Sequence, residues 1–549
     1  MEDVEEYAIG IDLGTTNCCV AVYRQGRVEI IPSNMGQTTT PSHISVSETA
    51  EVTVGEVSKR DHKGEFGTHY FNMKRLIGRR YEDKQVQDDI QYWPFHVIND
   101  GGRPKVDVYG SPHRPEEISA LILMQLKKEA ETYLLGRPVT KAVITVPAYF
   151  SSSQRQATKN AGKLAGFDVL RIINEPTAAA LGFNYRFPFE PPEDRNFLVF
   201  DLGGGTFDIV IISLTLDGHM RVKAVGGDTH LGGEDFDNEM VSHCANEFKK
   251  VHHLDPLQPK DGSRKAQADA YKRLQRLKYE CEVQKTFLSA ANHTTVNIDY
   301  FYNGEDLSVK ITRRQLNEMN ANLFDKCISI MDGVIRSADM DKSDIHNVIM
   351  VGGSTKIPEV RRRVEEYFQG KNLNYEISGD EAVAYGAALQ AAIMTGKLNL
   401  NVQLQDVIPL PIGIDSYNRT SGIIEFFELI TRNTPLPCLK ESNFSARHEG
   451  QDNIVTNILE GISKIPSENH LIATFHCSKL PHRLSKDDVL TIELSVDGEG
   501  ILKILAKLNG APLPDELVIN GFLHPVKASE LNSLNSFTVL NPSVLHWSN

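Results

Sequence analysis

The fold is decided by two stretches, IGIDLGTTNCCVAVY at residues 9–23 and LVFDLGGGTFDIVII at residues 198–212. Each reads as an apolar strand, the triplet Asp-Leu-Gly, a small polar turn and a second apolar strand. Their matching aspartates, Asp12 and Asp201, lie 189 positions apart. A repeat of this kind predicts two related lobes with a cleft between them. The alternative is a pair of unrelated hairpins with glycine turns, which are common.

The pattern around these stretches changes along the chain. Strand-like and helix-like segments alternate to about residue 398, which predicts an α/β domain over residues 5–398. A polar segment over residues 399–407 is typical of an interdomain linker. Short strands punctuated by Pro and Gly then predict a β-sandwich over residues 408–523. We expect residues 524–549 to form a loosely ordered tail.

Composition excludes several classes of protein. The 549 residues carry a net charge of −14 without a long basic run, which argues against nucleic acid or a membrane surface as the partner. No apolar run approaches the ~20 residues that span a bilayer. Seven cysteines without a C-x-x-C motif indicate neither a disulfide scaffold nor a zinc module. The acidic N-terminus does not resemble a secretory signal, so we expect a cytoplasmic protein with nuclear entry as an option.

Three glycine-rich turns could bind phosphate. They are residues 14–16, 203–206 and 352–355, and each adds Thr or Ser hydroxyls to its glycines. Neither of the two commonest nucleotide motifs, G-x-x-x-x-G-K-[ST] and G-x-G-x-x-G, occurs. Glycine lets backbone N–H groups approach a phosphate closely, so three such loops could hold a triphosphate between two lobes.

Carboxylates accompany two of these loops. Asp12 and Asp201 precede the glycines and Asp208 follows the second loop. They would repel a triphosphate unless a cation such as Mg²⁺ lay between, and Lys74 is a candidate for the cation expected from the protein itself. Taken singly, each aspartate could equally cap its own turn, and a lysine is by default exposed.

Nine segments resemble the heat-shock 70 kDa (DnaK-type) chaperone family. They are IGIDLGTTN, RLIGRR, ITVPAYF, QRQAT, INEPTAAA, DLGGGTFD, GDTHLGGEDFDN, VGGSTKIP and DEAVAYGAA, in this order. The resemblance covers residues 7–398 and continues more weakly to about residue 523. It implies an α/β two-lobed actin-like ATPase domain followed by a β-sandwich peptide-binding domain, with slow ATP hydrolysis.

The resemblance also implies roles for single residues. The catalytic group is Lys74, Asp12, Glu175, Asp201, Asp208 and Thr206, with Asp12 and Asp201 holding Mg²⁺ through water. ATP or ADP would be bound by Gly14, Thr15, Thr16, Asn17, Gly203, Gly204, Gly205, Gly232, Gly233, Glu282, Lys285, Ser289, Gly352, Gly353, Ser354, Lys356 and Asp380. K⁺ is a further candidate ion. Pro147 and Arg155 match a relay between the nucleotide and the second domain.

The chain departs from the family at the adenine. Thr286 and Lys356 stand where the family places arginines. Threonine cannot stack on a base and lysine stacks less well than a guanidinium, so we expect nucleotide retention to be weaker by about 1–2 kcal/mol.

The linker departs as well. It reads VQLQDV over residues 402–407, with glutamines where the family has leucines. Each lost apolar burial removes roughly 1.5–3 kcal/mol of docking energy, so we expect weakened coupling between ATP and peptide binding.

The second domain offers Ile424, Phe426 and Phe444 as a pocket for an extended apolar peptide, although they could simply be sandwich core. Glu425 and Glu428 add charge that could shift or abolish binding. We expect no helical lid after the sandwich, so a bound peptide should leave quickly.

The leading hypothesis is an ATP-dependent chaperone that binds unfolded or extended polypeptides and works with J-domain co-chaperones and nucleotide exchange factors. The alternative is a regulatory relative that binds ATP and other chaperones with little folding activity. A sugar or glycerol kinase of the same fold is disfavoured, because the nine segments point elsewhere.

Overall fold

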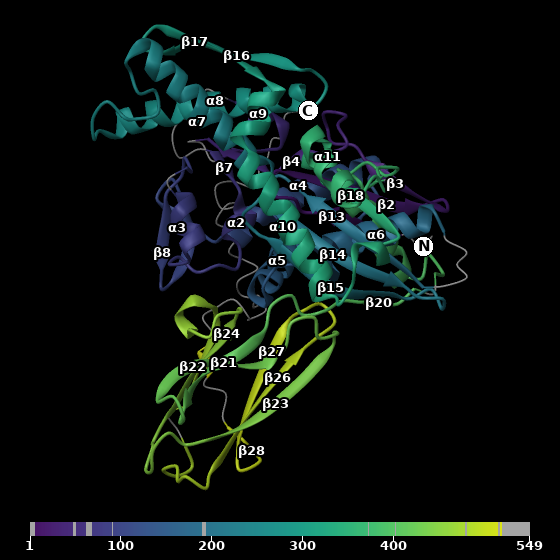
Figure 1. The fold of residues 1–549 in the computed structure, drawn as a ribbon, viewed down its shortest axis with the longest axis vertical. Coiled ribbons are helices and arrows are strands. Elements are labelled where there is room, and N and C mark those ends of the chain that lie inside the picture. The colour runs from purple at the N-terminus through teal and green to yellow at the C-terminus, as the bar shows by residue number, and fades with distance from the viewer. Residues whose placement is uncertain are drawn as a thin grey trace.

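The computed structural model describes residues 6–47, 51–61, 69–90, 92–188, 194–371, 373–400, 402–477, 480–513 and 517–518. The predicted tail over residues 524–549 lies outside these ranges. Figure 1 shows a helix-rich body and a separate unit built of strands. Within the described ranges, no helix combines the length and the apolarity needed to cross a bilayer.

The first lobe is built on a sheet that contains the first Asp-Leu-Gly stretch. Its strand order is β12 (Asp168–Asn174), β11 (Val139–Val146), β1 (Tyr7–Asp12), β2 (Asn17–Arg24) and β3 (Arg27–Ile31), with β4 (Thr40–Pro41) paired to β2. β1 runs antiparallel to β2 and parallel to β11. Asp12 therefore ends a buried strand at a tight turn.

The second lobe repeats this arrangement. Its strand order is β19 (Leu373–Asn374), β18 (Asn347–Val351), β13 (Arg195–Leu202), β14 (Phe207–Leu214), β15 (Met220–Asp228) and β20 (Leu404–Gln405). β13 runs antiparallel to β14 and parallel to β18, as β1 does to β2 and β11. The shared topology agrees with the internal repeat that the sequence predicts.

Smaller elements form the outer parts of both lobes. The first lobe carries β5 (His43–Val46), β6 (Val52–Val54), α1 (Glu56–Arg60), β7 (His69–Phe71), α2 (Met73–Leu76), α3 (Lys84–Ile90), β8 (Val97–Asp100), β9 (Arg103–Val108), β10 (Ser111–His113), α4 (Pro115–Tyr133) and α5 (Ser152–Leu164). The second carries α7 (Gly233–His252), α8 (Arg264–Leu288), β16 (His293–Tyr302), β17 (Glu305–Thr312), α9 (Arg313–Met319), α10 (Ala321–Ser337), η1 (Lys342–Asp344), η2 (Gly353–Lys356) and α11 (Pro358–Tyr367).

Two helices lie where the lobes meet. α6 (Glu175–Arg186) packs against β13 and β14, and α12 (Ala382–Met394) packs against α6, β1 and β2. Their seam is made of small residues: a Cβ on Gly386 would lie 1.7 Å from the Ala178 carbonyl oxygen, and one on Gly10 would lie 2.1 Å from the Ala388 nitrogen. The lobes therefore touch backbone to backbone along this seam.

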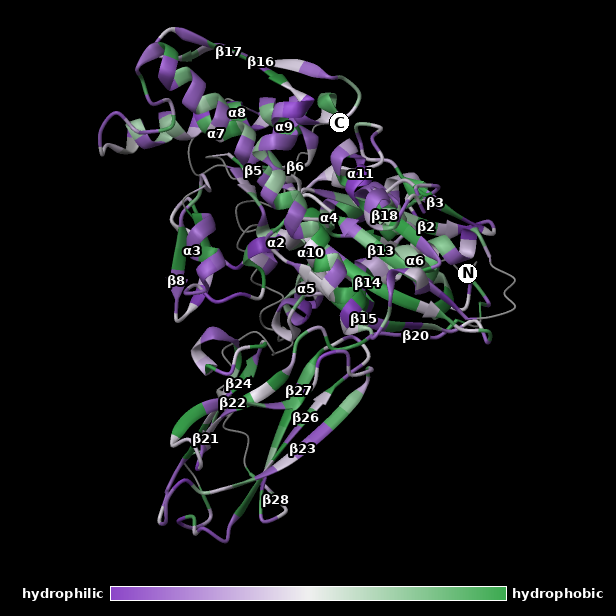
Figure 2. Cartoon of the chain, viewed as in Figure 1, coloured by the Kyte–Doolittle hydropathy of each residue, from purple (hydrophilic) through white to green (hydrophobic). Residues whose placement is uncertain are grey.

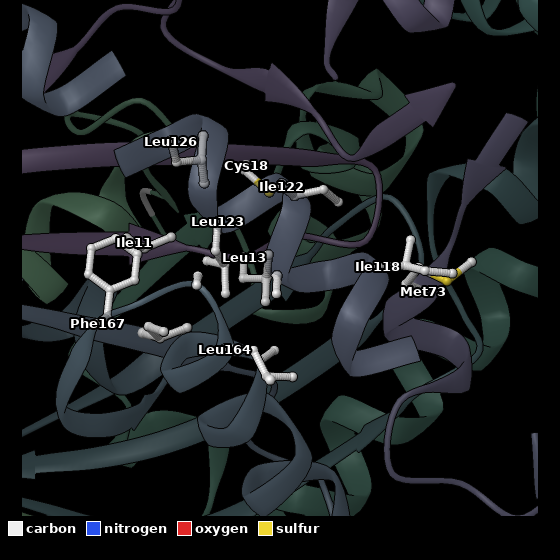
Figure 3. Close-up of a cluster of buried hydrophobic side chains, with 14 of the residues drawn as sticks. Ile11, Leu13, Cys18, Met73, Ile118, Ile122, Leu123, Leu126, Leu164 and Phe167 are labelled. Carbon is white, nitrogen blue, oxygen red and sulfur yellow. The ribbon is translucent and has the colours of Figure 1, made fainter. Parts of the chain in front are cut away.

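Apolar side chains fill the space between sheets and helices. The strands β2, β13 and β14 are among the most hydrophobic segments of the chain (Figure 2). In the first lobe, Ile11 of β1 and Leu13 just after it pack with Ile122 of α4 and Leu164 of α5 (Figure 3). Since this core anchors β1, it fixes the position of Asp12 at the end of the strand.

The C-terminal unit consists of two facing sheets. One has the order β22 (Ile423–Ile430), β21 (Ile412–Asn418), β24 (Ile454–Glu460), β25 (His470–Cys477) and β29 (Leu517–Val518), with η3 (Pro466–Glu468) before β25. The other has β23 (Cys438–Ser445), β26 (Val489–Val496), β27 (Leu502–Leu508) and β28 (Ala511–Pro512). Ile414 and Ile458 of one sheet share a core with Ile492 and Leu494 of the other.

The linker lies on the second lobe as an added strand. β20 pairs in parallel with β15, where Leu404 and Gln405 match Met220 and Arg221. The two glutamines, expected to weaken this docking, take part through their backbones: the Gln403 carbonyl accepts a hydrogen bond of 2.9 Å from the Met220 amide. Strand addition uses main-chain groups that any residue except proline supplies.

Candidate functional site

A cleft of about 480 Å³ opens between the two lobes. Most of the residues singled out in the sequence line it, namely Asp12, Gly14, Thr15, Thr16, Asn17, Lys74, Glu175, Asp201, Gly203, Gly204, Thr206, Gly233, Glu282, Lys285, Ser289, Gly352, Gly353, Ser354, Lys356 and Asp380. Asp208, Gly205 and Gly232 lie just behind this wall, and Asp208 is the strand partner of Asp201. The structure thus brings residues from both repeats to one cavity.

The three glycine-rich turns pack against one another. A Cβ on Gly204 would lie 2.0 Å from Thr16 Oγ1, so the first two loops touch only because this residue has no side chain. Gly352 has a φ of +84°, and a Cβ there would lie 2.2 Å from the Leu202 carbonyl oxygen. Ser354 Oγ donates a 2.8 Å hydrogen bond to the Gly203 carbonyl, which joins the third loop to the second.

Four carboxylates surround one lysine at the base of the cleft. Lys74 Nζ lies 2.5 Å from Glu175 Oε1, and both side chains are more than nine-tenths buried. Burial and the nearby Glu175 raise the pKa of Asp12 to about 7 and that of Asp208 to about 8, and they raise the pKa of Asp201 well above its ordinary value. Burial acts to lower the pKa of Lys74, but Glu175 and Asp12 raise it on balance.

This cluster places four carboxyl groups beside one lysine, and it suits a divalent cation because bound positive charge would favour their ionised forms. Asp201 Oδ2 is buried and makes no hydrogen bond among the described residues. In the same part of the chain, no three carboxyl, imidazole or thiol groups converge closely enough to hold an ion directly. Mg²⁺ keeps several of its waters and takes few protein ligands, so this spacing fits an ion held through water.

Two further residues orient these carboxylates, and sequence reasoning missed both. Thr145 Oγ1 donates to Asp12 Oδ1 at 3.5 Å, and the Tyr149 amide donates to Asp208 Oδ1 at 3.1 Å. Both belong to the segment ITVPAYF around Pro147, whose alternation of small and apolar residues gave no local sign of a polar role.

The opposite end of the cleft is lined by α8 and the third loop. Lys285 Nζ donates to Asp237 Oδ2 and to the Gly233 carbonyl at 2.8 and 2.7 Å. Lys356 forms an ion pair with Asp380, which holds its ammonium at the edge of the cleft.

Thr286 turns its hydroxyl back into its own helix. Its Oγ1 donates to the Glu282 carbonyl at 3.0 Å. The guanidinium of Arg276, on the same helix, also lines the cleft. The weaker stacking face expected from Thr286 and Lys356 therefore stays a prediction.

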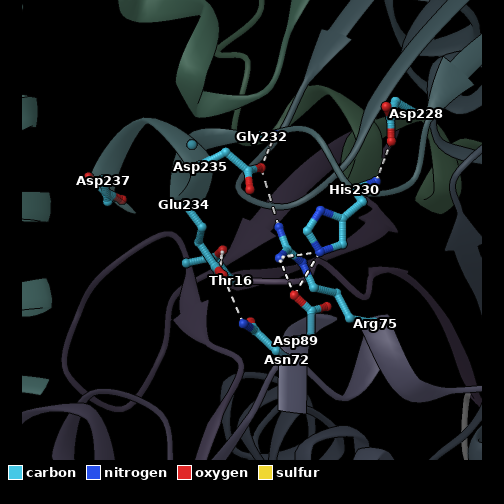
Figure 4. A network of polar contacts seen from close by, with 12 residues as sticks. Thr16, Asn72, Arg75, Asp89, Asp228, His230, Gly232, Glu234, Asp235 and Asp237 are labelled. Atoms are coloured by element: carbon cyan, nitrogen blue, oxygen red, sulfur yellow. Dashed lines mark hydrogen bonds and ion pairs between the residues drawn. The ribbon is translucent and has the colours of Figure 1, made fainter. Parts of the chain in front are cut away.

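A cluster of charged side chains joins the lobes across the cleft (Figure 4). Arg75 of α2 lies 3.4 Å from Asp89 of α3 and 3.4 Å from Asp235 of α7. His230 Nε2 lies 2.7 Å from Asp89 Oδ1 and 3.2 Å from Arg75 Nη1. A carboxylate only accepts and a guanidinium only donates, so Nε2 must carry a proton to bond Asp89. That hydrogen bond raises the pKa of His230.

Three other contacts cross between the lobes. Glu234 accepts from Asn72 Nδ2 at 2.8 Å and from Thr16 Oγ1 at 3.0 Å. Lys59 Nζ lies 2.8 Å from Glu282 Oε1. Together with the Arg75 cluster, these bonds hold the two lobes together across the cleft.

The predicted relay residue Arg155 lies between the lobes and the C-terminal unit. Its guanidinium donates to the carbonyls of Ala148 and Phe150 at 3.0 and 3.1 Å and to that of Glu499 at 3.5 Å. Pro147 precedes this group of carbonyls at the end of β11. Arg155 therefore binds the cleft segment and the C-terminal unit at once.

The linker aspartate is buried at the same junction. Asp406 Oδ1 accepts hydrogen bonds of 2.9 Å from Asn174 Nδ2 and from Thr177 Oγ1, next to Glu175 in sequence. Ser152 Oγ accepts from the Leu502 amide at 2.8 Å. The linker and the C-terminal unit are thus docked on the body of the protein.

The three predicted peptide-pocket residues do not share one face. Cross-strand partners point to the same side of a sheet, and the core residue Ile414 pairs with Phe427, whereas Ile424 pairs with Tyr417 and Phe426 with Asp415. Phe444 makes an edge-to-face ring contact with Phe427 at 5.6 Å. The structure therefore groups Phe444 with Phe427, which sequence reasoning missed, and places Ile424 and Phe426 on the other side.

Comparisons with known proteins agree with this architecture. A sequence profile of the Hsp70 protein family matches residues 8–535. The chain is 41% identical over 520 residues to "Heat shock 70 kDa protein 2" of Paracoccidioides lutzii, covering 93% of this chain and 76% of the relative. It is 39% identical over 542 residues to a heat shock protein of Pyricularia oryzae, covering 97% and 85%. It is 40% identical over 509 residues to "Heat shock cognate 70 kDa protein 3" of Dictyostelium discoideum, covering 91% and 78%.

Proposed function

The chain belongs to the Hsp70 family of ATP-dependent chaperones, which hydrolyse ATP, and from this premise we propose that hydrolysis takes place between the two lobes at the Lys74 cluster. The supporting observation is the cluster itself, in which buried carboxylates outnumber the one lysine at the point where the two phosphate loops meet. The finer division into an actin-like ATPase domain over residues 5–398, a linker over 399–407 and a peptide-binding β-sandwich over 408–523 is part of this proposal.

The backbone amides of the three glycine-rich loops would hold the phosphates, with Thr15, Thr206 and Lys74 at the terminal one. Water attacks the γ-phosphorus, the bond to the bridging oxygen breaks, and ADP leaves with that electron pair. The proton of the attacking water would pass to the ionised form of Asp208, which is a stronger base than an ordinary aspartate because burial raises its pKa to about 8. Glu175 would hold Lys74 in place.

Asp12 and Asp201 are the residues that would hold Mg²⁺ through its water shell. The ion would supply positive charge to the β- and γ-phosphates. K⁺ is proposed as a further ion on the family resemblance alone. Glu282, Lys285 and Ser289 would bind the adenosine, and Lys356 and Asp380 would close its far edge.

We also propose that extended apolar polypeptides bind beside Phe427 and Phe444. Phe427 is 44% exposed on the side of the sheet that faces the sandwich core, where a chain in strand conformation could insert a side chain. Binding of J-domain co-chaperones and exchange factors, and a cytoplasmic location, are proposals that rest on family membership.

The peptide proposal is tested by a matched pair of variants. Phe427→Ser should weaken binding of a fluorescent apolar heptapeptide about ten-fold or more, measured by anisotropy, because it removes a large apolar contact. Ile424→Ser changes a similarly exposed side chain on the opposite face and should leave binding unchanged. Equal losses in both variants, or a loss only in Ile424→Ser, would place the peptide elsewhere.

The alternative regulatory role has one observation in its favour. Glu425 lies opposite Ser416, on the same side of the sheet as Phe427, and brings charge to the proposed groove. A J-domain protein together with an apolar peptide should raise the steady-state rate of ATP hydrolysis if the chain is a folding chaperone. Tight ATP binding with a rate that neither partner changes would favour the regulatory role.

A further inference from the structure

A buried carboxyl group lies where the C-terminal unit meets the ATPase lobes. Glu460 ends β24 and is 3% exposed. Its backbone pairs with Ile412 on one side and with His470 on the other. Its Oε2 is buried and makes no hydrogen bond among the described residues. A charged carboxylate in this position would be poorly stabilised.

The nearest positive charge is already committed elsewhere. Arg155 of α5 spends its guanidinium on three backbone carbonyls, so it attracts Glu460 without bonding it. The Tyr149 hydroxyl lies near Glu460 on the lobe side, and Arg432 lies near Tyr149. Asp208, Asp228, Asp406 and Asp497 are the acidic groups that surround Arg155 and Tyr149. These acidic neighbours reduce the positive electrostatic potential around Arg155, which leaves little to stabilise an ionised Glu460.

The strand partner of Glu460 is also titratable and also faces the lobes. His470 Nε2 lies 3.4 Å from Ser153 Oγ at the start of α5, and its Nδ1 lies 3.7 Å from Asp83 Oδ2. Burial lowers the pKa of His470, Asp83 acts to raise it, and Arg79 and Arg80 act to lower it. The end of the β24–β25 hairpin therefore presents two ionisable groups that are both favoured in their neutral forms.

We propose that docking of the C-terminal unit on the ATPase lobes takes up a proton at Glu460, so that rising pH undocks the two parts. His470 sets the opposite limit, because its neutral form is the one that fits the docked interface. Docking is then strongest at mildly acidic pH and weakens on both sides of that range. This inference concerns the docked form alone and does not require ATP hydrolysis.

The sign follows from linkage. Burial raises the pKa of Glu460 from its ordinary value of 4.5 to about 8. The docking that depends on this proton is complete below the ordinary value and is lost as pH rises through the raised value. With an undocked carboxyl group already ionised, the docking constant should fall about ten-fold between pH 7 and pH 9. The His470 contribution is present above its ordinary value of 6.5 and is lost as pH falls below it.

Cleavage of the linker by thermolysin reports the undocked fraction, since β20 is protected while it pairs with β15. The full chain is incubated with the protease between pH 6.5 and 9, with and without a non-hydrolysable ATP analogue. The cut site is identified by mass spectrometry, and rates are divided by those of a free peptide of residues 398–410. The normalised rate of the natural chain should rise about ten-fold from pH 7 to pH 9.

Glu460→Gln copies the protonated form and should remove this rise, leaving the linker protected at pH 9. Glu468→Gln, a change at an exposed glutamate of the same unit, should keep it. Glu460→Met provides a second non-titrating side chain in case the glutamine variant folds poorly, which circular dichroism would reveal. A natural chain with a flat profile in both nucleotide conditions, or a Glu460→Gln variant that keeps the full rise, would overturn the proposal.

Discussion

Replacing Lys74 by alanine tests the charge balance of the cleft. The lysine and Glu175 side chains are 7% and 8% exposed, and their charged atoms lie 2.5 Å apart. Without the lysine, Glu175 stays buried beside Asp12 and Asp201 with no positive side chain in contact. Breaking a buried pair by removing one partner costs about 3–5 kcal/mol. We expect a loss at the lower end of this range, about 3 kcal/mol.

Stability and chemistry separate in a double-variant cycle. Urea unfolding should show that Lys74→Ala is destabilised and that adding Glu175→Gln recovers most of the loss, since the second change removes the unpaired charge. Single-turnover hydrolysis should fall about 100- to 1,000-fold in both variants, equivalent to about 2.7–4 kcal/mol, because neither supplies positive charge at the terminal phosphate. A Lys74→Ala chain with unchanged stability and unchanged turnover would refute the assigned role.

Three further changes probe other parts of the molecule. Thr286→Arg should tighten ADP binding about 5- to 30-fold in calorimetry by restoring a stacking guanidinium, and unchanged affinity would mean that this wall does not contact the base. Leu404→Asp should expose the linker to protease, because burial of the half-buried leucine contributes about 1 kcal/mol and a charged side chain would lose it, whereas Gln403→Ala keeps the backbone bond and should not. His230→Gln should speed ADP release at pH 6 in stopped-flow fluorescence. The natural chain should approach that rate as pH rises through the raised pKa of His230, since the positive charge that strengthens its bond to Asp89 is then lost. A pH-independent natural chain would contradict this explanation.

The sequence predicted well wherever a local pattern determines a backbone path. The Asp-Leu-Gly turns end buried strands, so the two repeats alone predicted that Asp12 and Asp201 would hold matching positions in two related lobes. Family membership, ATPase activity and chaperone function are confirmed by the comparisons. The glycine-rich turns could be identified from the sequence because the close packing of these loops excludes residues with a side chain.

The sequence predicted poorly wherever the partner lies far along the chain. Lys59 and Glu282 are 223 positions apart, and His230 and Asp89 are 141 apart, so no spacing rule links them. The face of β22 was equally hidden. IIEFFELI is apolar on both sides, and an irregularity in the pairing at Ile412 and Gly413 shifts the register that would otherwise decide which side faces the core.

The seam between α6 and α12 has a mechanical consequence. If long side chains interlocked at this seam, any rotation of one lobe against the other would require them to change rotamer and repack. Gly386 and Gly10 bring main-chain atoms into direct contact instead, so the two lobes can rotate against each other without repacking side chains at the seam. A force applied to the second lobe through the docked linker would then change the angle between the lobes, with little repacking of the seam. A single methyl group added at Gly386 would block this rotation by its clash with Ala178, while leaving every catalytic side chain in place.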